Sequence, residues 1–154
     1  MGPRDWLILA AFTLGTLAVG LASGLTAAGT ADQYRDLEQP SWAPPSWLFG
    51  PVWTVLYLMV GLSGYLAWAK VGWSRPLAFW VAQLVLNLAW TPLFFGAGLR
   101  GLALVDLGAL LVVLAATVMS FWPVSRPAAF LLLPYGVWVC FATALNASIW
   151  MLNR

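Results

Sequence analysis

The chain has 154 residues, of which 62% are hydrophobic and 8% are charged, and its mean hydropathy is +0.87. Soluble domains average about 45–50% apolar and about 25% charged residues, so this composition excludes an ordinary soluble enzyme and a disordered chain. The net charge of +2 comes from seven cations spread along the sequence. So few cations form no phosphate-binding patch, and we expect no nucleic-acid partner. An integral protein of the lipid bilayer is the class that remains.

Two residue counts limit the chemistry of the chain. It has one cysteine, Cys140, and no histidine. A single cysteine forms neither an internal disulfide nor a thiolate metal cluster. Histidine is the usual zinc ligand, haem ligand and acid–base catalyst, and the chain has none. We therefore expect no metal site and no cofactor. Tryptophan, by contrast, occurs 11 times, and this excess needs an explanation.

Five apolar stretches reach the length of about 20 residues that a membrane-spanning helix needs. In chain order they are residues 6–28, 47–69, 77–95, 102–122 and 128–150. Because the apolar runs are continuous rather than alternating, they predict helices and not a β-barrel. The first run exceeds the core of a signal peptide, which is about 7–15 residues, so we expect it to be retained as a span.

The predicted fold is therefore an all-α, multi-pass membrane protein, a single five-helix bundle with its termini on opposite sides of the membrane. Basic residues divide almost equally between the two sides, so the positive-inside rule leaves the orientation open. The sequence also leaves open whether a bacterial inner or outer membrane holds the protein. Pro92 and Pro134 fall inside spans, where they should bend the helices locally.

The segment 29–46 is the one long connection, and it carries Asp32, Arg35, Asp36 and Glu38. A short helix is predicted over 32–39, and three prolines stiffen the stretch that follows it. A stiff aromatic segment at a membrane surface can act as a lid over a cavity. It can equally act as an interfacial anchor, because tryptophan and tyrosine favour that depth.

Most tryptophans lie at or near span ends, where indole rings favour the membrane–water interface. These are Trp6, Trp47, Trp68, Trp73, Trp80, Trp122 and Trp150. Trp53, Trp90 and Trp138 lie deeper, where an indole N–H needs a partner. A rise of 1.5 Å per residue places Trp53 about 9 Å inward from the side that carries the long connection. The up-and-down topology places Asn87 and Asn146 in the same half.

Helical spacing groups these residues on shared faces. The groups are Gln83, Asn87 and Trp90; Trp53 and Tyr57; and Trp138, Ala142 and Asn146. Polar residues at this depth face the bundle interior or a cavity, so the amides either join helices by hydrogen bonds or contact a ligand. Together the faces predict a cavity beneath the long connection. Its preferred ligand would be large, flat and apolar.

Small residues favour close helix contacts, within the chain or in a homodimer. Gly20 and Gly24 form a GxxxG pattern in the first span. Such patterns are common, and this one does not distinguish between the two kinds of contact.

Four segments resemble the translocator protein family, whose members are also called tryptophan-rich sensory proteins or peripheral-type benzodiazepine receptors. They are YRDLEQPSWAPPSW at 34–47, VWTVLY at 52–57, QLVLNLAW at 83–90 and PYGVW at 134–138. The resemblance implies a five-helix bundle, often dimeric, that binds porphyrins, sterols and synthetic isoquinoline or benzodiazepine ligands beneath the first loop. Carried over by motif, the ligand-binding residues would be Tyr34, Pro44, Trp53, Asn87, Trp90, Trp138 and Ala142.

The resemblance also implies that some bacterial members degrade protoporphyrin in light, with tryptophans that match Trp53 and Trp138. These two residues would be catalytic only if this chain is such an enzyme. The family's sterol motif requires a tyrosine between an aliphatic and a basic residue. Here no tyrosine lies between Leu145 and Arg154, so porphyrins are favoured over sterols.

Three functions therefore compete. The leading one is a receptor or sensor for tetrapyrroles, which could also assist their transport or regulation. The second is a light-dependent porphyrin-degrading enzyme, and the third is a structural membrane scaffold. An ion-coupled transporter is disfavoured, because five spans do not divide into two equal repeats and carry no paired acids.

Overall fold

The computed structural model describes residues 2–28 and 31–154, and no strand occurs among them. The elements in chain order are α1 (Pro3–Ala28), α2 (Ala31–Asp36), η1 (Ser46–Leu48), α3 (Phe49–Val71), α4 (Arg75–Thr91), the π-helical turn η2 (Pro92–Gly96), α5 (Arg100–Phe121), α6 (Arg126–Leu131) and α7 (Leu133–Leu152). Within the described residues, five helical stretches are long and apolar enough to span a bilayer. The prediction of an all-α, five-span membrane protein is thereby confirmed.

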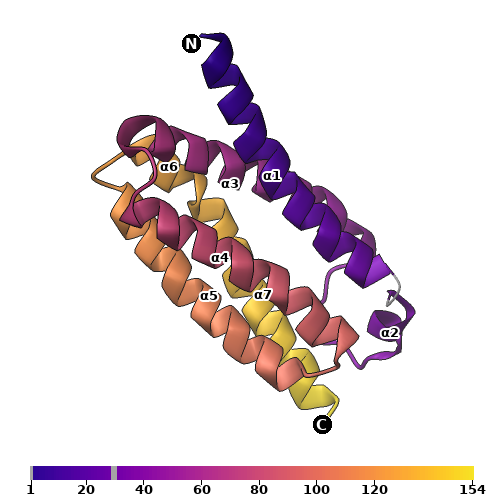
Figure 1. Ribbon diagram of the computed structural model, residues 1–154. Helices are drawn as coiled ribbons and strands as arrows, with labels where there is room; N and C mark the ends of the chain where they lie inside the picture. Colours follow the sequence, from indigo (N-terminus) through magenta and orange to yellow (C-terminus); the bar gives the residue numbers. More distant parts are fainter. Residues whose placement is uncertain (1, 29–30) are drawn as a thin grey trace.

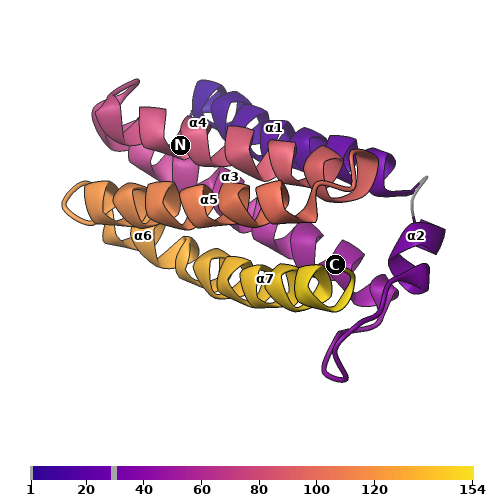
Figure 2. The same cartoon turned by 90° about the horizontal axis from the view of Figure 1, so that it is seen from below.

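The spans lie side by side, and the two termini lie at opposite ends of the bundle (Figure 1). Helix α1 packs on α3 and α4, α4 packs on α5, and α5 packs on α7. Helix α2 lies at the end of the bundle that also carries the C-terminus (Figure 2). The single long connection is therefore next to the end of α7.

Helices α1 and α3 meet closely at Gly61. A Cβ atom there would lie 2.7 Å from the Thr13 Cα atom, so only glycine allows this approach. The Thr16 hydroxyl donates a hydrogen bond of 2.8 Å to the carbonyl of Tyr57 on α3. Gly20 faces the Tyr57 ring, whereas beyond the adjoining backbone of α1 no described atom lies within 4 Å of the Cβ position of Gly24. The first glycine of the GxxxG pattern thus serves packing within the chain.

Two prolines coincide with interruptions of their spans. Pro92 begins the π-helical turn η2 at the end of α4. Pro134 lies in the first turn of α7, next to the break at Leu132 that separates α6 from α7. Proline has no N–H to donate to the preceding turn, which accounts for both positions.

Helix α2 ends at Asp36, earlier than the predicted end at residue 39. Gln39 precedes a proline, a position that disfavours helical backbone. The Gln39 side-chain amide donates instead to the carbonyl of Tyr34 at 2.6 Å. The chain therefore leaves the helix early and continues along the end of the bundle.

The prediction that Trp80 lies at the membrane interface is wrong. Its side chain is only 6% exposed, and its indole N–H donates to the carbonyl of Val60 at 3.0 Å. Gly64 of α3 leaves the space that the ring occupies. Trp80 is therefore part of the contact between α3 and α4.

Candidate ligand cavity

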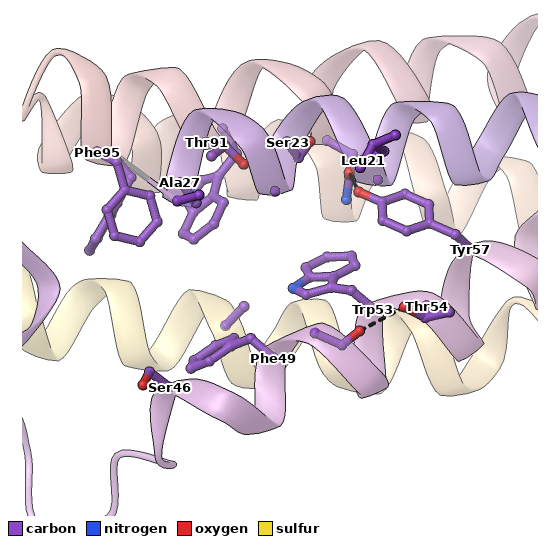
Figure 3. A pocket seen from close by; sticks show the side chains of 18 of the residues that line it. Leu21, Ser23, Ala27, Ser46, Phe49, Trp53, Thr54, Tyr57, Thr91 and Phe95 are labelled. Carbon is purple, nitrogen blue, oxygen red and sulfur yellow. Dashed lines mark hydrogen bonds between the residues drawn. The ribbon is translucent and has the colours of Figure 1, made fainter. Parts of the chain in front are cut away.

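A cavity of about 800 Å³ lies between α1, α3, α4 and α7, at the end of the bundle that carries α2 (Figure 3). This volume lies within the range of about 300–1,000 Å³ that is usual for small-molecule sites. The walls are mainly apolar. They include Leu17, Gly20, Leu21, Gly24, Tyr34, Ser46, Phe49, Trp53, Thr54, Tyr57, Asn87, Trp90, Thr91, Phe94, Phe95, Ala142, Leu145 and Asn146.

Five of the seven residues that the sequence assigned to a ligand line this cavity. They are Tyr34, Trp53, Asn87, Trp90 and Ala142. Pro44 and Trp138 are not among the described residues that line it. The assignment of all seven residues to a bound ligand stays a prediction. The role of segment 29–46 as a lid also stays a prediction, and residues 29 and 30 of this segment lie outside the described residues.

Trp138 lies behind the cavity wall rather than on its surface. Its ring is perpendicular to that of Trp53, with 6.4 Å between the centroids, and it also contacts Phe49 at 5.9 Å. Its indole nitrogen is buried and has no hydrogen-bond partner among the described residues. Trp138 therefore supports the two rings that face the cavity.

A polar group lies at the deep end of the cavity. The Tyr57 hydroxyl donates to Oδ1 of Asn87, and Nδ2 of Asn87 donates to the Tyr135 hydroxyl at 3.0 Å. Asn87 and Tyr57 line the cavity, whereas Tyr135 is buried behind it. An asparagine amide has two donors and two acceptor lone pairs. The amide can therefore keep both tyrosines and still offer a polar contact.

Trp90 is held in place by residues from two other helices. Its indole N–H donates to Oδ1 of Asn146 on α7 at 3.0 Å, and Nδ2 of Asn146 donates to the carbonyl of Arg100 at 2.9 Å. The ring also stacks on Phe94 at 5.2 Å. The interhelical hydrogen bond considered for Asn146 is thus present. Gln83 forms none, because both polar atoms of its side chain are buried without a partner in the described part of the chain.

Tyr34 lies at the α2 end of the cavity. Its ring is 8% exposed and packs edge-on against Phe49 at 6.0 Å and Phe95 at 6.3 Å. Burial raises the pKa of the Tyr34 phenol above its ordinary value. Its hydroxyl is buried and has no hydrogen-bond partner among the residues that the structure describes, so it is available to a ligand.

Comparisons with known proteins identify the family of this chain. The model of the TspO/MBR family matches residues 10–151. This chain belongs to the TspO/MBR family. It is 41% identical to the Translocator protein of Sus scrofa over 155 residues, which cover 97% of this chain and 92% of the relative. It is 43% identical to the Tryptophan-rich protein TspO of Archaeoglobus fulgidus, with 96% and 97% covered, and 33% identical to the Tryptophan-rich sensory protein of Cereibacter sphaeroides, with 97% and 93% covered.

The sequence of this TspO/MBR family member did not predict that α1 contributes to the cavity wall. Leu17, Gly20, Gly24 and Ala27 line the cavity, and their spacing of three or four residues places them on one helix face. That spacing was visible in the sequence. None of these four residues is polar or aromatic, however, so the pattern does not differ from that of any apolar helix face.

Proposed function

We propose that this chain is a membrane receptor of the sensory type, which binds a flat, apolar tetrapyrrole such as a porphyrin in the cavity. The observation that carries the proposal is the pairing of a cavity of about 800 Å³ with Trp53 and Trp90 in its wall. The printed names of the relatives, which include a Tryptophan-rich sensory protein, support a sensory role.

The lining matches the chemistry of such a ligand. Aromatic rings bind flat apolar molecules by stacking or edge-on contact, and the indoles of Trp53 and Trp90 are held by Tyr57 and Asn146 respectively. A tetrapyrrole also carries polar groups, for which Asn87 and the Tyr34 hydroxyl provide partners. The expected homodimer belongs to the same proposal, as close helix contacts through small residues would allow.

The first experiment is a titration of the purified protein with protoporphyrin in detergent and in the dark, followed by quenching of tryptophan emission. We expect saturable quenching, and a dissociation constant about tenfold higher for Trp53→Leu. An aromatic pair contributes about 0.5–1.5 kcal/mol beyond its buried area, and tenfold corresponds to about 1.4 kcal/mol. Trp138→Leu should weaken binding less, because Trp138 lies behind the wall.

Trp6→Leu is the matched control, because Trp6 is 59% exposed and belongs to the part of α1 that does not line the cavity. It should bind as the wild type does. If the folded double variant Trp53→Leu, Trp138→Leu retains wild-type affinity, the cavity is not the porphyrin site. If the wild-type protein shows no saturable quenching, the receptor proposal fails and a scaffold role takes its place.

Light-dependent oxidation of the porphyrin by dioxygen is the second candidate function. The observation that favours it is the continuous contact of oxidisable rings, in which Trp53 stacks on Tyr57 at 5.4 Å and meets Trp138 at 6.4 Å. Illumination of the same samples tests it. A new absorbing product that forms only in light, and is lost in Trp138→Phe while binding persists, would establish the enzyme.

A further inference from the structure

The segment after α2 is tied to the end of α7 by one side chain. The Asn153 side chain accepts a hydrogen bond from the backbone N–H of Glu38 at 3.0 Å, through Oδ1. Its Nδ2 donates to the backbone carbonyl of the same Glu38 at 2.9 Å. The two residues are 115 positions apart in the sequence. The contact therefore joins the segment that follows α2 to the C-terminal end of α7.

The contact depends on the chemistry of a primary amide. An amide offers a donor and an acceptor side by side, as a peptide group does, and it therefore pairs with both backbone groups of one residue. The second hydrogen of Nδ2 goes to the carbonyl of Ile149 at 2.8 Å, which fixes the side chain on the last turn of α7. Aspartate retains the acceptor but has no donor, and leucine has neither.

Two further contacts lie before and after Glu38 in the sequence. On one side, the Gln39 amide holds the carbonyl of Tyr34, whose ring lines the cavity. On the other side, the Trp42 ring packs on Phe141 of α7 at 5.7 Å. Helix α7 also lines the cavity through Ala142 and Asn146. One helix thus provides both a cavity wall and the attachment of segment 34–42.

We propose that Asn153 is a latch that holds segment 34–42 at the cavity end and thereby sets the rates of ligand entry and release. This inference rests on the proposed function. The latch hydrogen bonds are solvent-exposed, and such bonds stabilise a contact only modestly. The segment can therefore separate from α7 and return without unfolding of the bundle, as a gate requires.

The first test measures hydrogen exchange by mass spectrometry in the ligand-free protein. We expect peptides that cover 34–42 to exchange about tenfold faster in Asn153→Ala and in Asn153→Asp, since each variant loses at least one latch hydrogen bond. Peptides from α4 and α5 should not change. Arg154→Gln is the matched control, because its side chain lies over the Trp150 ring rather than on segment 34–42. Equal exchange in all four proteins would overturn the latch.

The second test measures protoporphyrin binding kinetics by stopped flow. We expect both the association and dissociation rate constants to rise about tenfold in Asn153→Asp, while the dissociation constant changes less than threefold. A defect in the cavity itself would instead change the dissociation constant, as expected for Trp53→Leu. If segment 34–42 opens in the exchange experiment but ligand release keeps its wild-type rate, ligand leaves by another route, and the gate is overturned.

The two tests separate this inference from the proposed function. If the wild-type chain does not bind protoporphyrin, the receptor proposal fails and the gating of that ligand fails with it. The exchange experiment still decides whether Asn153 holds the segment. A cooperative thermal transition with a midpoint within about five degrees of the wild type shows that the Asn153 variants are folded, because the lost hydrogen bonds lie at the exposed end of α7 and contribute little to global stability.

Discussion

Asn87 connects three helices through one side chain. From α4 it accepts a hydrogen bond from Tyr57 of α3 and donates one to Tyr135 of α7. Polar groups inside a membrane protein find no water to replace a lost partner. The asparagine is therefore expected to contribute to stability as well as to the polarity of the cavity.

Asn87→Leu removes this shared partner without a large change in volume. Two buried hydroxyls then lose a hydrogen bond, and each unsatisfied group costs about 1–3 kcal/mol. We expect a clear decrease in the thermal unfolding midpoint in detergent, followed by near-ultraviolet circular dichroism. Val85→Leu on the exposed face of the same helix is the control. An unchanged midpoint in Asn87→Leu would show that the hydroxyls find other partners.

At the residue scale, the sequence predicts the depth of a side chain along the bundle better than the direction in which that side chain points. The depth of Trp90 and Asn146 was predicted correctly, and the two side chains meet. Trp80 was placed at the interface because it follows a helix start closely, yet Gly64 admits it into the core. Trp138 has the depth of the cavity but turns toward Phe49. The rotation of each helix about its axis depends on its neighbours, which hydropathy does not report.

At the scale of elements, the contact of α1 with α3 depends on the missing side chain of Gly61. Gly61→Ala would bring a methyl group within 2.7 Å of Thr13 Cα and within 2.6 Å of Thr16 Oγ1. Backbone atoms cannot move aside as a flexible side chain does, so α1 must shift. Overpacking of this kind typically costs about 1–3 kcal/mol, which exceeds the gain of about 0.5–1 kcal/mol from replacing a helical glycine by alanine.

The matched control for Gly61→Ala is Gly15→Ala on α1, where no described neighbour lies within 4 Å of the added methyl group. We expect Gly61→Ala to lower the free energy of unfolding and Gly15→Ala to leave it unchanged or raise it slightly. Unfolding by sodium dodecyl sulfate, followed by circular dichroism, measures both. Equal stabilities of the two variants would contradict the close contact.

The sequence predicts the presence of each spanning helix, but it does not predict the end of the short helix α2. All five spans follow from apolar length alone, and prolines near their first turns agree with the observed starts of α4 and α6. The early end of α2 depends on Gln39 and on the distant Asn153, which together take the backbone groups of Tyr34 and Glu38. A contact over 115 residues is not visible in a local pattern.

At the scale of the whole molecule, five spans place the termini on opposite sides of the membrane. Cysteine labelling in spheroplasts tests this, on a Cys140→Ser background that removes the single native thiol. A membrane-impermeant maleimide should label either Gly2→Cys or Arg154→Cys, but not both. Both should react after detergent is added. Equal labelling of both in intact spheroplasts would contradict an odd number of spans.

Helix α1 separates the cavity from the surroundings of the bundle as a single layer. Its buried residues are Phe12 and Thr16, and beyond Gly20 it lines the cavity with one face while its other face is exposed. In a bilayer, an outward movement of this helix displaces lipid. The work of widening the cavity is therefore the lateral pressure of the membrane multiplied by the area gained. The bilayer, as well as the protein, then determines how far the cavity can widen.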